Sequence, residues 1–168
     1  MPSKEPIQVK PIGVIHTTYH EHGETPIQGV FKPEGRGWVE VFPEYREGLK
    51  DIEGFSHLFL IYLFHRTSEV KLVAAPFLET TPHGIFAIRG PMRPNHLGLS
   101  VVRLERVEGH RLDIAEVDML DGTPLLDIKP YVSHFDRRDN VRCGWVDKQF
   151  EDGVPPHASR KDSPGAGS

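Results

Sequence analysis

Residues 98–117 read GLSVVRLERVEGHRLDIAEV, and this stretch decides the fold. Apolar and polar side chains alternate along 98–107 and again along 111–117, as they do in strands with one buried face. Between them, Glu108-Gly109-His110 supplies the glycine that suits a tight turn. The stretch therefore predicts a β-hairpin.

Further strands are predicted on both sides of this hairpin. Residues 55–65 hold the longest apolar run of the chain and are rich in aromatic and branched side chains. Shorter strands are expected at 7–16, 37–42, 71–74, 84–88 and 125–131. Only residues 43–50 have the end signals of a short helix. Because strands outnumber helices too strongly for βαβ alternation, we predict an all-β fold that closes, or nearly closes, into a barrel.

The composition indicates a soluble chain with one domain. It has 168 residues, 38% of them hydrophobic, and a formal net charge of -4, which argues against a dedicated nucleic-acid coating protein. No apolar run reaches the length of a membrane span, and the first residues lack the apolar region of a signal peptide. The single Cys143 cannot form an intrachain disulfide, so we expect a cytoplasmic protein. We expect the domain at 1–150 and a disordered tail, rich in Gly, Pro and Ser, at 151–168.

Several common site types are not expected, because their motifs are missing. Gly35-Arg36-Gly37 is only a fragment of G-x-G-x-x-G, which argues against a Rossmann nucleotide site. Neither a P-loop nor a G-x-S-x-G nucleophile elbow occurs in the sequence. His57 and His65 share one strand face but would lie roughly 26 Å apart, and Cys143 has no C-x-x-C partner. We therefore expect no metal site.

Two rigid loops present polar side chains. Arg89 to Ser100 contains arginines, an asparagine and a histidine between prolines, and Asp118 to Pro124 is an acidic turn. Cationic and acidic groups on rigid loops suggest a site for a polar, partly charged ligand, whereas the alternative is a pair of solvated surface turns. His65-Arg66, where the long strand turns polar, would lie at a barrel rim. The long Gly- and Pro-rich loop at 17–37 is a further candidate.

A series of short motifs also occurs in a fixed order, which is specific as a set. These motifs are Pro11-Ile12-Gly13-Val14-Ile15-His16, Phe55-Ser56-His57-Leu58, Phe64-His65-Arg66, Gly84-Ile85-Phe86-Ala87-Ile88-Arg89, Arg93-Pro94-Asn95 with Gly98-Leu99-Ser100, and Leu120-Asp121-Gly122-Thr123-Pro124 with Asp127-Ile128-Lys129-Pro130-Tyr131. Over residues 7–147 the chain thereby resembles the TsaA-like (TrmO-type) family of S-adenosylmethionine-dependent tRNA methyltransferases.

This resemblance implies a small single-sheet β-barrel with one or two short helices and no Rossmann domain. It implies a homodimer that binds S-adenosylmethionine near the subunit interface. The implied reaction is methylation of N6 of threonylcarbamoyl-adenosine, the modified base beside the tRNA anticodon. The anticodon loop of tRNA is therefore the expected partner, and no membrane is involved.

The resemblance also implies which residues form the site. Cofactor contacts are expected from Gln28, Gly29, Val30, His65, Arg66, Arg89, Leu99, Asp118, Met119, Leu120 and Asp121. Arg93 and Asn95 are expected to hold the target nucleotide, whose unstacked base can be splayed out of a single-stranded loop. Asp121 and His65 are both candidates for the catalytic base. His96 departs from the family pattern, which commonly has proline there.

Three alternatives stay open from the sequence. The same cofactor could serve a different acceptor, a protein or a small molecule, because the chain shows no C-terminal extension of the kind that some bacterial members have. A non-catalytic barrel could instead bind nucleotide or RNA, and a pure RNA binder would need no methyl donor. In the third alternative the loops only mediate dimer contacts.

Overall fold

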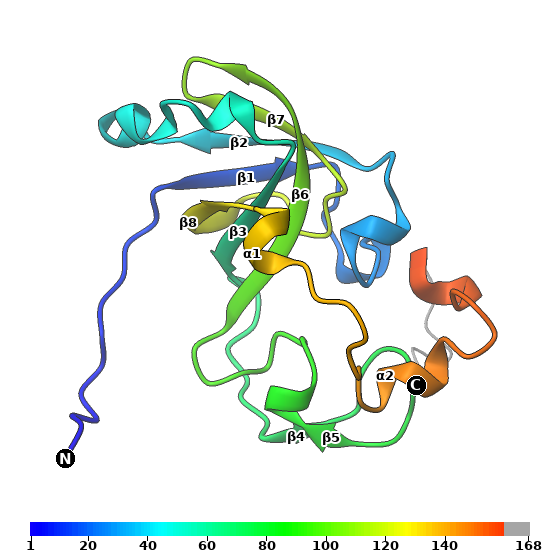
Figure 1. The fold of residues 1–168 in the computed structure, drawn as a ribbon. Coiled ribbons are helices and arrows are strands. Elements are labelled where there is room, and N and C mark those ends of the chain that lie inside the picture. Colours follow the sequence, from blue (N-terminus) through cyan, green and yellow to red (C-terminus); the bar gives the residue numbers. More distant parts are fainter. Residues whose placement is uncertain (160–168) are drawn as a thin grey trace.

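Six antiparallel strands close into one barrel, in the order β1-β2-β7-β6-β3-β8 (Figure 1). The computed structural model describes residues 1–159. The barrel strands are β1 (Gly13–Thr17), β2 (Arg36–Val41), β3 (His57–Leu63), β6 (Leu97–Glu108), β7 (Arg111–Ala115) and β8 (Thr123–Pro130). β4 (Val73–Ala74) and β5 (His83–Gly84) pair only with each other. The predicted all-β barrel is confirmed, and β6 with β7 is the predicted hairpin.

The helices of the structure are all short. The 3-10 helices are η1 (His22–Glu24), η2 (Gly29–Phe31), η3 (Pro43–Leu49), η4 (Ile52–Gly54), η5 (Ile85–Ala87) and η6 (Pro156–Ser159). The α-helices are α1 (Ser133–Asp136) and α2 (Val146–Gln149). The helix predicted at 43–50 is thus present as η3, with Pro43 in its first turn. Within residues 1–159, every helix is too short or too polar to cross a membrane.

The interior of the barrel is filled by side chains. Residues of β3 and β6 alternate between the interior and the outer face, as strand geometry requires. Fully buried apolar side chains come from all six barrel strands and include Ile15, Val39, Leu58, Leu60, Val102, Leu112, Ile114 and Leu125. Burial of each such side chain contributes about 1.5–3 kcal/mol. Because the interior is packed, a ligand site has to lie at an end of the barrel or outside it.

Two predicted strand regions differ from the structure. β1 begins only at Gly13, and Ile7 is 90% exposed, because the preceding segment leaves the barrel without a partner strand. The strands predicted at 71–74 and 84–88 are reduced to the two-residue strands β4 and β5. They belong to an excursion between β3 and β6, residues 70–95, which we call the lobe and which lies at one end of the barrel in Figure 1.

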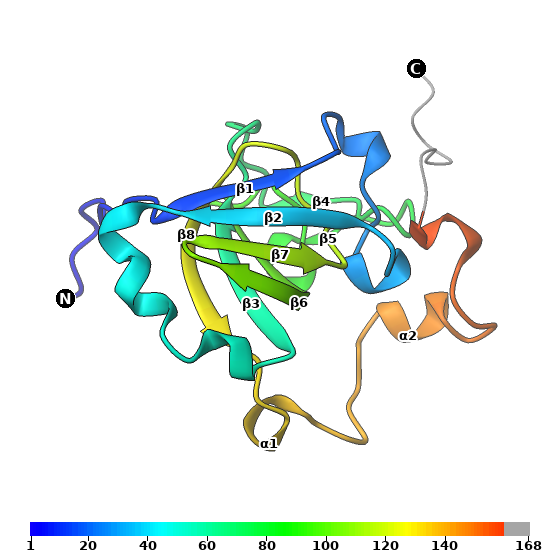
Figure 2. The same cartoon turned by 90° about the horizontal axis from the view of Figure 1, so that it is seen from above.

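The C-terminal segment folds back onto the molecule. Figure 2 shows it leaving α1, crossing one side of the molecule and ending near the loop before β2. The predicted tail starts at residue 151, yet η6 is formed and Ala158 is fully buried. The backbone N–H of Ile27 donates to the carbonyl of Ala158 at 3.1 Å, which explains why this part is ordered. Residues 160–168 of the predicted tail lie outside the described residues.

Candidate functional site

A small cavity lies at the end of the barrel where β3 ends and β6 begins. Its volume is about 30 Å³. It is lined by His22, Tyr62, Phe64, His65, Arg66, Thr67, Asp118, Met119, Leu120 and Thr123. The fold therefore brings together five of the residues predicted to bind a cofactor, which are His65, Arg66, Asp118, Met119 and Leu120.

A chain of hydrogen bonds fixes the Asp118 carboxylate in the cavity wall. The Ser100 hydroxyl donates to Oδ1 of Asp118 at 2.6 Å. The backbone N–H of Gly29 donates to Oδ2 at 3.2 Å. Ser100 has a single hydroxyl proton, so the Tyr62 hydroxyl is the donor in its 2.9 Å bond to Ser100. The carboxylate is thus held from two sides, by β6 and by the loop that contains η2.

Two glycines make this arrangement possible. Gly98 is the partner of Tyr62 across β3 and β6. A Cβ at Gly98 would lie 2.2 Å from Cε2 of the Tyr62 ring, so only glycine lets the ring cross β6 and reach Ser100. A Cβ at Gly29 would lie 1.6 Å from the carbonyl oxygen of Glu116. Glycine at position 29 therefore allows the backbone to approach Asp118 closely.

Burial shifts the pKa values of Asp118 and Tyr62, the two acidic groups in this series of hydrogen bonds. It raises the pKa of Asp118 to about 6, because desolvation outweighs the opposing hydrogen bonds from Ser100 and Gly29. Desolvation also raises the pKa of Tyr62, and the nearby Asp118 charge adds to this shift. The phenol therefore stays a donor at neutral pH, while the carboxylate is mostly ionised. A weakly solvated carboxylate that remains partly accessible is a strong partner for a cation.

His65 and Arg66 form the rim of the cavity. Desolvation, together with the charge of Arg66, lowers the pKa of His65 from its usual 6.5, so its imidazole is neutral at pH 7 and can accept a proton. The Arg66 guanidinium donates to the carbonyl of His20 and lies 3.5 Å from the Glu21 carboxylate. Because this ion pair is exposed, it contributes little free energy. The rim is therefore joined only weakly to the loop before β2.

That loop, residues 20–31, also touches the lobe; we call it the early loop. Nη1 of Arg89 donates to Oε1 of Gln28 at 3.0 Å. The neighbour Gly29 is the donor to Asp118, whereas Val30 is 62% exposed. The structure thus brings Gln28, Gly29 and Arg89 to one side of the Asp118 carboxylate.

Arg93 is engaged inside the lobe. Its Nη1 lies 3.1 Å from the carbonyl of Ile85, 2.8 Å from that of Ile88 and 3.3 Å from that of Gly90. The guanidinium group therefore holds the turn that contains η5. Asn95, the other residue predicted to hold the nucleotide, is exposed on the same loop.

At His96, where the family commonly has proline, the backbone has a conformation that proline cannot adopt. His96 has a φ of 49°, in the left-handed region, and its Nδ1 lies 3.0 Å from the carbonyl of Pro91. Proline cannot adopt this φ, because its ring fixes φ near −65°. The loop here follows a course that the usual proline would not allow.

Asp121 and Leu99 lie away from the cavity. Oδ1 of Asp121 accepts a hydrogen bond from the backbone N–H of Thr17 at 3.1 Å and lies 3.5 Å from Nδ1 of His16. Asp121 therefore fixes the end of β1. Leu99 is 52% exposed on the outer face of β6, opposite to the inward side on which Ser100 lies.

Leu99 belongs to an apolar patch on the barrel wall. Three cross-strand pairs follow one another on the outer side of β3 and β6, namely Leu63 with Leu97, Ile61 with Leu99, and Phe59 with Val101. Their β6 members are 42%, 52% and 39% exposed, respectively. A continuous apolar strip on a sheet face is typical of a surface that binds protein.

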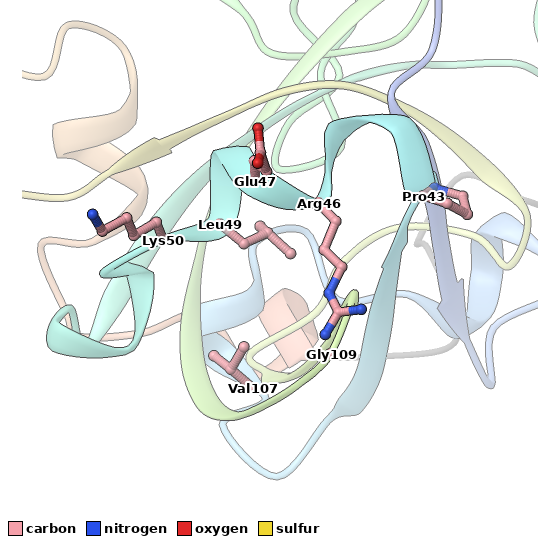
Figure 3. Close-up of a pocket in the computed structure, with 7 residues that line it drawn as sticks. All are labelled: Pro43, Arg46, Glu47, Leu49, Lys50, Val107 and Gly109. Carbon is pink, nitrogen blue, oxygen red and sulfur yellow. The ribbon is translucent and has the colours of Figure 1, made fainter.

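A second, larger hollow of about 400 Å³ lies near the opposite end of β6 (Figure 3). It is lined by Pro43, Arg46, Glu47, Leu49, Lys50, Val107 and Gly109. Figure 3 shows Arg46 reaching toward the β6–β7 turn and Lys50 pointing away from it. None of the predicted site residues line this hollow, and its charged groups are of both signs. The Asp118 cavity is therefore the better candidate.

Sequence reasoning missed Tyr62 and Ser100. A signal for both was present, because strand alternation places Gly98, Ser100 and Val102 on one face of β6 and Tyr62 on the matching face of β3. A hydroxyl on an inward face has to find a partner, which marks it as part of a polar site. In the part of the chain that the structure describes, no group of three or more His, Cys, Asp or Glu side chains could hold a metal ion.

Comparisons with known proteins agree on one family. The family model of the tRNA-methyltransferase O N-terminal domain matches residues 14–137. The chain is 55% identical to a probable S-adenosyl-L-methionine-binding protein of Pyrococcus abyssi, over 83% of this chain and 76% of that protein. It is 31% identical to the human tRNA (adenine(37)-N6)-methyltransferase, over 92% of this chain but only 37% of that protein. The crystal structure of TrmO from Pseudomonas aeruginosa superposes with a TM-score of 0.72 at 39% identity, covering 84% of this chain and 63% of that one.

Proposed function

The chain belongs to the family of the tRNA-methyltransferase O N-terminal domain, and from this premise we propose that it is an S-adenosylmethionine-dependent tRNA (adenine-N6)-methyltransferase. Its acceptor is N6 of threonylcarbamoyl-adenosine beside the anticodon. The support is the identity to proteins named tRNA (adenine(37)-N6)-methyltransferase, 34% for the mouse protein and 31% for the human one. The observation that points most directly to the cofactor is the partly accessible Asp118 carboxylate in the cavity wall.

The residues around the cavity suit S-adenosylmethionine chemically. When bound, this cofactor supplies a methyl group on a positively charged sulfonium. Asp118 offers a weakly solvated negative charge to the cationic part of the cofactor. Arg89 is placed to bind its carboxylate once it releases Gln28. Phe64, Met119 and Leu120 offer an apolar wall to the adenine.

The cavity has to widen to admit the cofactor. Its volume of about 30 Å³ is far below the roughly 300–1,000 Å³ of a ligand pocket. The weakest boundary is the exposed contact of Arg66 with His20 and Glu21. We assign the opening movement to this side, where residues 20–24 can separate from the rim at little cost. Gln28 and Gly29, at the other end of the early loop, stay in place.

His65 is the group that takes up the proton that N6 loses. It lines the cavity and its imidazole is neutral at pH 7, since its pKa is lowered. The carbonyl group next to N6 lowers the basicity of that nitrogen and makes its proton easier to lose. A weak base is therefore sufficient, and most of the rate enhancement comes from positioning the two reactants. Asp121, the other candidate base, has a positioning role instead. Its bond to the Thr17 N–H ties it to the end of β1 and so holds the preceding residues 118–120 in place.

The active unit in this proposal is a homodimer. The apolar strip of Leu97, Leu99 and Val101 is the surface that a second copy covers, and Ser100 lies on the same strand, so the cofactor site is next to the interface. Leu99→Glu places a charge in the strip and should give a monomer in sedimentation equilibrium, whereas Val141→Glu, at a site that is 57% exposed elsewhere, should leave the dimer intact. A wild-type chain that sediments as a monomer would contradict this part of the proposal.

The first experiment is calorimetric titration of the full chain with S-adenosylmethionine, with ATP as the control. Saturable binding of the methyl donor and no binding of ATP is the expected result. The second is methyl transfer to tRNA with and without the threonylcarbamoyl group, followed by mass spectrometry of the nucleosides. Transfer only to the modified tRNA supports the proposed acceptor, whereas no transfer to either tRNA points to a protein or small-molecule acceptor. Absence of cofactor binding, also with tRNA present, would refute the enzyme proposal.

A further inference from the structure

Residues 143–159, which we call the strap, lie beyond the segment that the family model matches. In Figure 1 the strap passes beside the lobe and then beside the early loop. The lobe contains Arg89, to which the proposed function gives a cofactor contact, and the early loop contains Gln28 and Gly29, which the family resemblance implies as cofactor contacts. The contacts of the strap with each of them are specific.

The first set of contacts joins the strap to the lobe. Nε1 of Trp145 donates to the carbonyl of Ala87 at 2.8 Å, and its ring stacks on His83 with centroids 4.9 Å apart. Nε2 of Gln149 donates to the Glu79 carboxylate at 2.9 Å. Trp145 also packs against the small core of the lobe, which consists of Ala74, Ile85 and Ile88. The strap therefore completes a core that the lobe does not complete by itself.

The second set of contacts joins the strap to the early loop. The ring of Phe150 stacks on that of Phe31, with centroids 5.8 Å apart. The backbone N–H of Ile27 donates to the carbonyl of the buried Ala158 at 3.1 Å. Ile27 and Phe31 flank Gln28 and Gly29 on both sides.

The strap thus contacts the lobe and the early loop next to Arg89, Gln28 and Gly29, which lie on one side of the Asp118 carboxylate. Ala87 lies two positions before Arg89, and Ile27 and Phe31 flank Gln28. The two segments are also joined directly, by the exposed hydrogen bond from Arg89 to Gln28. A bond of this kind is too weak to fix two loops relative to each other. The contacts of the strap are more extensive and lie outside the cavity, where a ligand does not displace them.

We propose that the strap is a positioning element that fixes Arg89 and Gln28-Gly29 relative to each other and so sets the affinity for S-adenosylmethionine. The inference rests on the proposed function. Affinity falls when only a fraction of the molecules has both segments in the binding arrangement. Loss of the strap contacts should therefore weaken cofactor binding without altering the chemical step, because His65 lies just after β3 and Asp118 keeps its bond to Ser100 of β6.

The test compares Trp145→Ala and Phe150→Ala with Lys148→Ala, all in the full chain. Lys148 is exposed in helix α2, whose two ends are flanked by Trp145 and Phe150. For the first two variants we expect the Kd for S-adenosylmethionine to rise about tenfold and kcat at saturating cofactor to stay within about twofold. Lys148→Ala should match the wild type. Trp145→Phe keeps a ring against His83 and should recover part of the lost affinity. Unchanged Kd in both Trp145→Ala and Phe150→Ala would overturn the inference.

Hydrogen exchange without any cofactor separates this inference from the proposed function. In Trp145→Ala and Phe150→Ala we expect faster exchange of backbone amides in residues 27–31 and 85–90 and unchanged exchange in β3 and β6. Faster exchange throughout the barrel would mean that the strap only stabilises the fold, which contradicts a positioning role. If the wild type fails to bind S-adenosylmethionine, the proposed function fails, and the exchange data alone decide whether the strap holds the two segments.

Discussion

Replacing Asp118 by asparagine should stabilise the protein at pH 8 and destabilise it at pH 4. Burial raises the pKa of this carboxyl from 3.8 to about 6 in the folded chain. Between these values the folded state binds more protons than the unfolded state, so the free energy of unfolding falls as the pH rises through this window. An amide does not ionise, so the Asp118→Asn variant is free of this loss.

The size of the effect follows from the pKa and from the hydrogen bonds. A shift of about two pKa units corresponds to roughly 3 kcal/mol at 1.36 kcal/mol per unit. The amide oxygen can still accept from Ser100, but its NH₂ group then faces the N–H of Gly29, which removes one hydrogen bond at a cost of about 1 kcal/mol. We expect the variant to gain about 2 kcal/mol at pH 8 and to lose roughly 0.5 kcal/mol at pH 4, where the unfolded carboxyl of the wild type is already partly ionised.

Urea unfolding at pH 4 and pH 8 measures both differences. A net gain of about 2 kcal/mol corresponds to a melting temperature higher by roughly 4–8 °C. The control is Asp139→Asn, because Asp139 is 69% exposed and should change stability by less than about 0.5 kcal/mol at either pH. The variant should also bind S-adenosylmethionine more weakly, since the amide has no negative charge. A difference between variant and wild type that is the same at both pH values would refute the burial argument.

Three further substitutions test other parts of the structure. Gly98→Ala should lower the melting temperature, because its Cβ would lie 2.2 Å from the Tyr62 ring, at a cost of about 1–3 kcal/mol. Adding Tyr62→Leu to this variant should restore part of the lost stability. An unchanged melting temperature in Gly98→Ala would contradict the packing of the ring against β6. His65→Gln should lower kcat and, at saturating S-adenosylmethionine, abolish the fall in kcat that the wild type shows at acid pH, where the imidazole becomes protonated. Saturating cofactor removes the effect of Asp118 protonation on binding, so an acid limb of kcat that persists in the variant would mean that another group is the base. Arg93→Ala should speed amide exchange in the turn of the lobe around η5, since three carbonyls lose their donor, and leave β1 and β2 unaffected; slow exchange in this turn would show that the arginine is dispensable there.

The strands of the barrel could be predicted because each has one buried face, which makes apolar and polar side chains alternate along the sequence. The hairpin of β6 and β7 and the long strand β3 show this pattern over many residues. The pattern fails in the lobe, where apolar residues such as Ile85 and Ile88 pack into a small separate core instead of a sheet. It fails again at Ile7, which has the residue type of a strand but no neighbouring strand to pair with.

The site could be predicted only where it follows from local sequence. The rim at His65 and the loop at Asp118 were recognisable as polar segments after strands, and they do share a cavity. The bonds from Tyr62 through Ser100 to Asp118 join three strands or loops, and their meeting depends on the register of β3 against β6. The guanidinium of Arg93 turns inward because three carbonyls of its own lobe converge on it, which no pattern of residue types reveals.

The pairing of β1 with β8 determines when the site forms during folding. Two bonds at this seam, from the Thr17 hydroxyl to the Met119 carbonyl and from the Thr17 N–H to Asp121, join residues more than a hundred positions apart. The hairpin of β6 and β7 joins residues that are much closer in the sequence. Closing a long loop costs more chain entropy than closing a short one, so long-range contacts form more slowly. We therefore expect the segment from Met119 to Asp121 to take up its position only when the barrel seam closes, so a chain with a formed hairpin and an open seam should have an incomplete cofactor site. Cofactor added during refolding would bind after this closing step and draw the equilibrium toward the closed barrel by mass action.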